Sequence, residues 1–376
     1  MHTLLRRAFR KARHVLSPPP EPWPSPSVHD VFTNCDWRLL VPEEKVPTPE
    51  TSSMKLDKYS EYLQHPSYTA PRLQTALLPD VTYCATNNVV IVENSKVLAE
   101  TTGPGARSAN IDWRTLEAKR PTMNIRGRAT ALRCPFNNHY HLLVDNIPRL
   151  LQLHHPYFRS QSPIKLLCPG GCTSKESYLL DRILPPYVDI HPVPEETFCR
   201  VEQYIFLPFA TKKASGYLHG QIAKKYRDML GILNEPSNKS DKGSSPPLRL
   251  YLSRRNANTR HISNERELIH GLQKRGFQIC MPEMMTLPQQ IELFKQADFV
   301  VGPHGAGLAN ILFSSAIDVL ELFGSESITT HYYLLAKSLG HSYKYLSFKS
   351  SDYIDDSFYA DADDIFASVD ETLMTK

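Results

Sequence analysis

Two segments, far apart in the chain, concentrate glycine, histidine and carboxylate residues. One is residues 299–313, FVVGPHGAGLANILF, and the other is residues 137–150, NNHYHLLVDNIPRL. In the first, an apolar run leads into a turn that contains Gly302, Gly305 and Gly307 and then into a helical pattern. The first amides of a helix have no internal partner, and with the helix dipole they favour an anion. The segment therefore predicts a phosphate-binding turn.

Side chains in this turn could complete the site. Gly305, Ala306 and Gly307 would let a phosphate approach the backbone closely. His304 could donate to the phosphate or to an attached sugar, and Asn310 lies one turn into the expected helix. A glycine turn of this kind can also be a purely structural connection between a strand and a helix, with no ligand.

Two further strand ends supply charge. Arg254 and Arg255 follow an apolar strand at 249–253, and Glu321 lies in another strand at 318–323. Arginine forks suit a diphosphate, and a carboxylate can accept hydrogen bonds from ribose hydroxyls. Taken singly, the arginine pair could be a solvated face and the glutamate a structural partner. Ligands of open α/β sheets bind outside the carboxyl ends of the strands, so the three elements together favour a nucleotide site.

The second segment could supply a general base. His141 and Asp145 are four residues apart, so a helix places them on one face. Either group could take a proton from an attacking hydroxyl. Asp145 could instead cap a helix with Pro148 in its first turn, or pair with Arg149. His139 and His141 could form a metal pair, but the sequence identifies no third ligand.

Alternating strands and helices must position the glycine turn. The expected elements between residues 248 and 350 are strands at 249–253, 277–281, 299–302, 318–323 and 343–348 and helices at 264–275, 286–297, 308–313 and 330–339. Capping-box patterns start two of the helices, at Asn264 and Thr286. This alternation predicts a parallel, doubly wound sheet. Asp361 and Asp363 we interpret as the start of a last helix, not as a metal motif.

The rest of the chain divides by composition. Short strands are expected at 81–85, 88–93 and 96–99, the last two joined by a turn at Asn94 and Ser95. Residues 234–247 contain no apolar residue and predict a linker. The domain organisation that we expect is an N-terminal extension at 1–55, a first domain at 56–235, a linker at 236–247, a nucleotide-binding Rossmann-like domain at 248–350 and a C-terminal tail or helix at 351–376.

Charge and cysteine usage exclude other classes. The 376 residues carry a net charge of +4, and five basic residues fall within the first sixteen. The remainder has no basic stripe, which argues against a nucleic-acid partner. The seven cysteines show no zinc-like spacing, and we expect most to be buried thiols. Residues 1–16 form an amphipathic pattern that either contacts an anionic membrane surface or is a solvated tail.

The motif at 302–313, with Val319-Leu-Glu-Leu322 after it, resembles the signature of glycosyltransferase family 61, the DUF563 family. The wider likeness covers about residues 251–322 and 137–150. It implies a GT-B architecture: α/β, with two Rossmann-like domains facing a cleft. It also implies a nucleotide-sugar donor, inversion at the anomeric carbon, no catalytic metal, and a His-x3-Asp element at His141 and Asp145. Ala309 stands where the family often has Thr, and Ser315-Ala316-Ile317 where it often has Pro-Gly.

These observations favour an inverting glycosyltransferase that joins a sugar to a glycan or glycoconjugate acceptor in surface or capsular polysaccharide synthesis. The nucleotide sugar is a substrate, and we expect no metal or other cofactor. A cytoplasmic enzyme, peripheral on the inner membrane face, is expected because no apolar run is long enough to span a membrane. The alternative is a non-catalytic nucleotide- or glycan-binding subunit with the same fold. A dehydrogenase is disfavoured, because the turn is not G-x-G-x-x-G and falls late in its domain.

Overall fold

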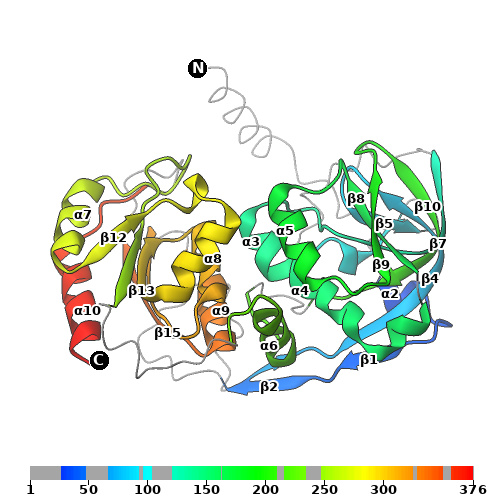
Figure 1. Cartoon of the computed structure of the whole chain (residues 1–376), viewed down its shortest axis with the longest axis horizontal. Helices are drawn as coiled ribbons and strands as arrows, with labels where there is room; N and C mark the ends of the chain where they lie inside the picture. Colours follow the sequence, from blue (N-terminus) through cyan, green and yellow to red (C-terminus); the bar gives the residue numbers. More distant parts are fainter. Residues whose placement is uncertain are drawn as a thin grey trace.

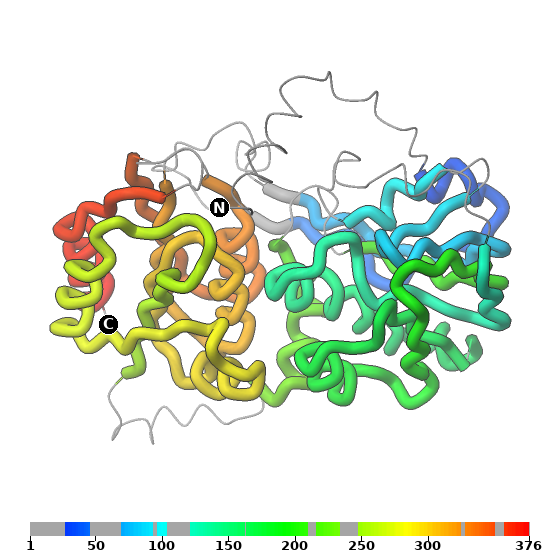
Figure 2. The backbone as a smooth tube through the Cα atoms, turned by 90° about the horizontal axis from the view of Figure 1, so that it is seen from above, coloured from blue at the N-terminus to red at the C-terminus, as the bar shows by residue number. Residues whose placement is uncertain are grey.

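Two α/β domains lie side by side (Figures 1 and 2). The computed structural model describes residues 27–47, 67–92, 96–103, 121–161, 163–209, 216–233, 247–324, 328–349 and 357–375. The predicted basic helix at 1–16 lies outside the described residues, as do the proline-rich residues up to 26 and the predicted linker apart from Pro247.

The first domain contains a mixed eight-stranded sheet in the order β6-β5-β4-β10-β7-β8-β9, with β1 also paired to β4. Its strands are β1 (Arg38–Val41), β4 (Leu73–Cys84), β5 (Val89–Val92), β6 (Lys96–Val97), β7 (Met123–Ala131), β8 (Ile164–Pro169), β9 (Val188–Val193) and β10 (Phe198–Phe206). β10, β7, β8 and β9 are parallel, as in a Rossmann half, whereas β1, β4, β5 and β6 pair antiparallel. The expected hairpin of β5 and β6 is confirmed.

Several N-terminal residues that the sequence assigned to an extension take part in this architecture. β1 extends the sheet beside β4, and β2 (Glu44–Pro47) pairs with β3 (Ser67–Ala70) in a separate two-stranded sheet. A short helix α2 (Val28–Val31) buries Val28 beneath the larger sheet. The sequence missed these strands because each has only 4 residues, too few to show an alternating pattern.

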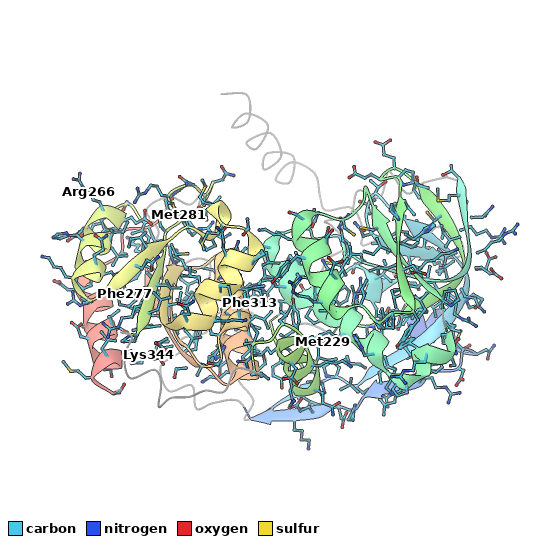
Figure 3. All side chains as sticks on the ribbon, viewed as in Figure 1. Met229, Arg266, Phe277, Met281, Phe313 and Lys344 are labelled. Atoms are coloured by element: carbon cyan, nitrogen blue, oxygen red, sulfur yellow. The ribbon has the colours of Figure 1, made fainter. Side chains whose placement is uncertain are left out.

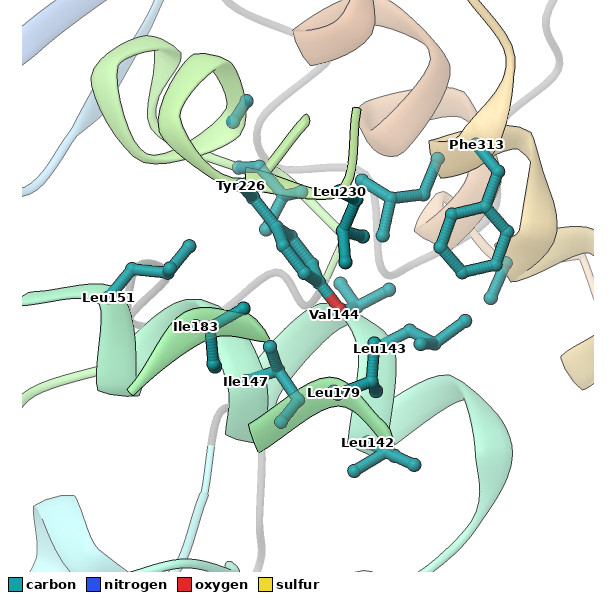
Figure 4. Packing of buried hydrophobic residues seen from close by; sticks show 14 of the residues in the cluster. Leu142, Leu143, Val144, Ile147, Leu151, Leu179, Ile183, Tyr226, Leu230 and Phe313 are labelled. Carbon is teal, nitrogen blue, oxygen red and sulfur yellow. The ribbon is translucent and has the colours of Figure 1, made fainter. Parts of the chain in front are cut away.

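The helices of the first domain carry the second polar segment. They are η2 (Ala99–Thr101), α3 (His139–His141), the π-helical turn η5 (Leu142–Asn146), α4 (Ile147–Leu150), η6 (Leu151–His154), η7 (Pro156–Gln161), α5 (Ser174–Ile183) and α6 (Gly220–Met229). α3, η5 and α4 form one continuous helical stretch, and its apolar side chains pack against α5 and α6 (Figure 4). Asp145 therefore lies inside a helical stretch and does not cap a new one.

The second domain is a five-stranded parallel sheet in the order β12-β11-β13-β14-β15. Its elements are β11 (Leu248–Leu252), α7 (Glu265–Lys274), β12 (Phe277–Cys280), η9 (Pro282–Met284), α8 (Leu287–Gln296), β13 (Ala297–Pro303), η10 (Ala306–Phe313), β14 (Asp318–Gly324), α9 (His331–Leu339) and β15 (Ser342–Phe348). The predicted alternation is confirmed, and so is the capping box at Thr286. Asn264 is different: its side chain makes no cap bond, because it bonds the backbone of Ala360 instead.

The last helix, α10 (Ala362–Met374), completes the second domain. Asp361 caps it through the amides of Asp363 and Asp364, which confirms the interpretation of this pair as a helix start. Ile365 and Val369 are buried in the domain core. Gly271 of α7 lets Phe366 approach, since a Cβ there would lie 1.9 Å from the Phe366 ring.

The two domains share one continuous apolar core. It joins Leu143 and Val144 of η5, Tyr226 and Leu230 of the α6 region, and Phe313 at the end of η10 (Figure 4). Side chains, including those of Met229 and Phe313, fill the boundary between the lobes (Figure 3). Each large apolar side chain buried in this way contributes roughly 1.5–3 kcal/mol. None of the described helices is long and apolar enough to cross a bilayer.

Candidate active site

The glycine turn links β13 to η10 at the carboxyl edge of the second sheet. The His304 amide still bonds Leu322 O at 2.9 Å, which fixes the turn to β14. A Cβ at Gly302 would lie 2.9 Å from the Cβ of Leu252 in β11, so the strand needs glycine there. In the described part of the chain, the amides of Gly305, Ala306 and Gly307 have no hydrogen-bond acceptor. Ala306 and Gly307 are partly exposed, so the turn is open to an incoming anion.

Arg254 lies directly against this turn. Its guanidinium donates to Thr259 O at 3.1 Å, and a Cβ on Gly305 would approach Nη1 to 2.0 Å. Burial lowers the pKa of Arg254, and the nearby charge of Arg260 adds to this. Arg255 is different: it is exposed, and its Nε lies 4.0 Å from Glu265 at the start of α7. Arg254 is thus brought to the turn, whereas Arg255 points toward α7.

Arg260 is the second cation at the turn, and sequence reasoning did not select it. Its Nη1 donates to His304 O at 3.2 Å. Its backbone adopts a positive φ of 61°, which is uncommon for a residue with a side chain and fits a constrained loop. Nothing in the sequence indicates this contact, because Arg260 lies in a loop and does not follow a strand end directly.

His304 forms an imidazole–carboxylate pair with Glu321 of the neighbouring strand. Nδ1 lies 2.5 Å from Glu321 Oε1, and Tyr343 OH donates to Oε2 at 2.5 Å. Burial raises the pKa of Tyr343 well above its usual value, so its hydroxyl stays a donor. Glu321 is completely buried with both oxygens engaged. The role of Glu321 in this geometry is to orient His304, and its burial does not fit the predicted contact with ribose hydroxyls.

His141 forms a second imidazole–carboxylate pair, with Asp145 in the first domain. Nδ1 lies 2.5 Å from Asp145 Oδ2, and both residues belong to the helical stretch that starts at His139. The Asn138 side chain accepts from the His141 amide at 3.0 Å and fixes the start of that stretch. The π-helical turn holds Asp145, and such turns often occur at functional sites. The Phe136 ring stacks on His141 at 4.9 Å.

Aromatic and histidine rings connect the two pairs across the domain boundary. The His331 ring lies 6.1 Å from His304 and 5.4 Å from Tyr140, the neighbour of His141. Tyr332 lies 5.3 Å from His304, and its hydroxyl donates to Gly305 O at 2.6 Å. Burial lowers the pKa of His331 to about 4, and the charges of His304, His141 and Arg260 add to the effect. His331 is therefore a neutral ring between two pairs.

Asn310 has a structural role at the same boundary. It is completely buried, its Oδ1 lies 2.8 Å from His139 Nε2, and its Nδ2 donates to Gln290 Oε1 at 2.9 Å. Burial lowers the pKa of His139 to about 4, so this ring is neutral. The predicted nucleotide contact of Asn310 does not fit this burial, because its amide already links the two domains.

Metal binding has little support in the described region. There, no three His, Cys, Asp or Glu side chains gather as a metal site would require. His139 faces Asn310 and His141 faces Asp145, so these two histidines point to different partners. The expectation that the reaction needs no metal stays a prediction.

The fold and this geometry define a two-domain α/β protein in which a glycine turn of the second domain carries the His304–Glu321 pair and a helical stretch of the first domain carries the His141–Asp145 pair. Residues 139–317 match the model of the protein family described as Glycosyltransferase 61. The chain therefore carries a glycosyltransferase family 61 domain, as the sequence resemblance predicted. The match begins at the helical stretch of His141 and includes the glycine turn. A search of curated proteins found no match.

Proposed function

We propose that the protein is an inverting glycosyltransferase that uses a nucleoside-diphosphate sugar and a glycan or glycoconjugate hydroxyl. The observation that supports this most is that His331 and Tyr332 of α9 contact both His304 of the glycine turn and Tyr140, the neighbour of His141. One side offers a proton acceptor, and the other offers amides and cations for a diphosphate. Direct displacement needs both at once.

His141 is the proposed general base. Asp145 accepts from Nδ1 and orients the ring, so Nε2 is the nitrogen that we assign to proton transfer. As the acceptor oxygen attacks the anomeric carbon, Nε2 takes the hydroxyl proton. Asp145 then stabilises the imidazolium that forms, which is the task of the carboxylate in hydrolase triads.

The diphosphate is the leaving group, and the second domain stabilises it. When the bond from the anomeric carbon to the diphosphate oxygen breaks, negative charge grows on that oxygen. We assign the stabilisation of this charge to the amides of the glycine turn, the start of η10, Arg254 and His304. Because the acceptor attacks from the side opposite the leaving group, the anomeric configuration inverts.

Nucleoside diphosphate release tests this function. The full-length protein is incubated with a panel of uridine and guanosine diphosphate sugars and acceptor glycans, and released diphosphate is measured. Thermal unfolding with uridine and guanosine diphosphate at millimolar concentration reports binding alone. We expect at least one nucleotide to stabilise the protein and one donor to be turned over. No stabilisation and no release with any nucleotide would contradict the proposal.

A non-catalytic binding subunit gives a different pattern. It would be stabilised by a nucleotide but would release no diphosphate. The wild type and the His141→Ala variant would be stabilised by nucleotide to the same extent. His191→Ala is the matched control, because His191 is a partly exposed histidine on β9 of the same domain.

Surface polysaccharide is the proposed product class, made on the cytoplasmic side of the membrane. Residues 1–16 supply the proposed peripheral contact with anionic lipid. Co-sedimentation with phosphatidylglycerol vesicles, compared with phosphatidylcholine vesicles, tests this part separately. Equal sedimentation with both would remove the membrane contact and leave the transferase proposal intact.

A further inference from the structure

Two cysteines meet where β8 ends in the first domain. Figure 1 shows the position of β8. Cys168 is buried at the end of this strand, and Cys172 is partly exposed just before α5. Their Sγ atoms lie 2.9 Å apart. A disulfide bond is about 2.05 Å long, so a shift of roughly 1 Å would bring the sulfurs to bonding distance.

The backbone between the two cysteines forms a tight turn. Gly170 and Gly171 have φ angles of +67° and +82°, a region that residues with side chains rarely adopt. The Gly171 amide donates to Cys168 O at 3.1 Å and closes the turn. A Cβ at Gly170 would lie 2.4 Å from the Glu195 carboxylate, so this glycine also has no room for a side chain.

Arg133 holds this turn from inside the domain. Its guanidinium donates to Pro169 O at 2.6 Å and to Gly171 O at 2.8 Å, one on each side of the turn. It also forms a buried ion pair with Glu176 of α5 at 2.6 Å. The cysteine pair therefore lies in a fixed frame, next to a cation and before the first turn of a ten-residue helix. Both features stabilise a thiolate.

The two sulfurs are unequal. The hydrogen bond from the Cys168 thiol lowers the pKa of Cys172 and outweighs burial and the charge of Glu176, which both raise it. The pKa of Cys168 is raised, because its proton is held by Cys172 and because it is buried. Cys172, which is the more exposed, is thus the nucleophile, and Cys168 is the thiol that follows it.

We propose that Cys168 and Cys172 are a reversible dithiol–disulfide pair, oxidised by a low-molecular-weight disulfide such as oxidised glutathione. The Cys172 thiolate attacks one glutathione sulfur, forms a mixed disulfide and releases one glutathione thiolate. Cys168 then loses its proton and attacks Cys172 Sγ, which releases the second glutathione. The protein loses two hydrogens and two electrons, and the glutathione disulfide gains them as two thiols.

Peptide mass spectrometry of the full chain tests the pair. The reduced protein is incubated with oxidised glutathione, quenched in acid, alkylated with N-ethylmaleimide under denaturing conditions and digested. We expect the segment with Cys168 and Cys172 to be two hydrogens lighter and free of label. Dithiothreitol should restore both labels. Label on both cysteines after oxidation, or a stable glutathione adduct on Cys172, would overturn the proposal.

Single variants separate the two roles. Cys168→Ser should trap glutathione on Cys172, because no second thiol can displace it. Cys172→Ser should leave Cys168 as a free thiol, because a buried, protonated thiol does not attack glutathione disulfide. Cys35→Ser is the matched control: Cys35 is partly exposed, but its thiol donates to Leu77 O. This variant should oxidise like the wild type, and loss of the 168–172 disulfide in it would also overturn the proposal.

Discussion

The two imidazole–carboxylate pairs have the same core geometry and opposite origins. In each, a histidine Nδ1 lies 2.5 Å from a carboxylate oxygen. His141 and Asp145 are four residues apart in one helical stretch, whereas His304 and Glu321 come from a turn and a neighbouring parallel strand. Glu321 has a second partner in Tyr343 and is completely buried. The first pair is local to one helical stretch, and the second is locked into a sheet beside the glycine turn.

Removal of His141 should have the largest effect. We expect His141→Ala to lower kcat about 10²- to 10⁴-fold, the usual contribution of a general base. Stabilisation by nucleoside diphosphate should stay at the wild-type level, since the nucleotide contacts lie in the other domain. Steady-state kinetics and thermal unfolding measure the two quantities, with His191→Ala as the control. A large loss of nucleotide binding in His141→Ala would contradict the assignment of catalysis to one pair and nucleotide binding to the other.

His304→Ala should give the complementary result. We expect nucleotide stabilisation to fall and kcat/KM to drop about 10²-fold, because a donor to the growing negative charge is lost. Titration with nucleoside diphosphate by calorimetry measures the affinity. An unchanged affinity together with a loss of kcat alone would assign His304 to the acceptor side.

His331, between the pairs, should make stability depend on acid pH. Its folded pKa is about 4 and its unfolded value 6.5, so below 6.5 the unfolded chain binds a proton that the folded chain does not. The free energy of unfolding should therefore fall as the pH drops from about 6.5 to about 4, by roughly 1–3 kcal/mol for this residue. Urea unfolding at several pH values should show a shallower dependence for His331→Asn. Equal dependence in both proteins would mean that His331 is already protonated when folded.

The carboxylates should separate stability from rate. Glu321→Gln leaves a neutral amide among buried donors and should destabilise the fold by about 1–3 kcal/mol while weakening nucleotide binding. Asp145→Asn should lower kcat with little change in nucleotide affinity. Chemical unfolding and the split between kcat and KM test this, and Glu196→Gln, at an exposed loop position in the first domain, is the control for the loss of a charge. If Glu321→Gln and Asp145→Asn changed stability, kcat and nucleotide affinity in the same way, the two pairs would not have separate roles.

Gly305→Ala should have the smallest effect. Its Cβ would meet Arg254 Nη1 at 2.0 Å, but the end of a long side chain can move. We expect a several-fold weaker affinity for nucleoside diphosphate and an intact fold. Gly340→Ala, at a positive φ in the same domain with open space around it, should affect folding stability and leave the affinity unchanged. If Gly305→Ala left the affinity unchanged and Gly340→Ala weakened it, Arg254 would not be part of the nucleotide site.

What the sequence predicted depended on how local each feature was. The strand–helix alternation of residues 248–350, the glycine turn and the four-residue spacing of His141 and Asp145 could all be recognised from neighbours in the chain. Arg260, His331 and Tyr332 could not, because only the packing of α9 and the loop after β11 brings them to the turn. The burial of Asn310 and Glu321 was equally hidden, since both are covered by residues from other elements.

The shared core of Leu143, Val144, Tyr226 and Phe313 has a mechanical consequence. Parting the lobes would expose apolar surface on both sides and would break the bonds from Arg227 to the carbonyl oxygens of Ser314 and Ser315. A wide clamshell motion is therefore expensive for this molecule. The relative position of the two lobes should accordingly stay nearly constant during turnover.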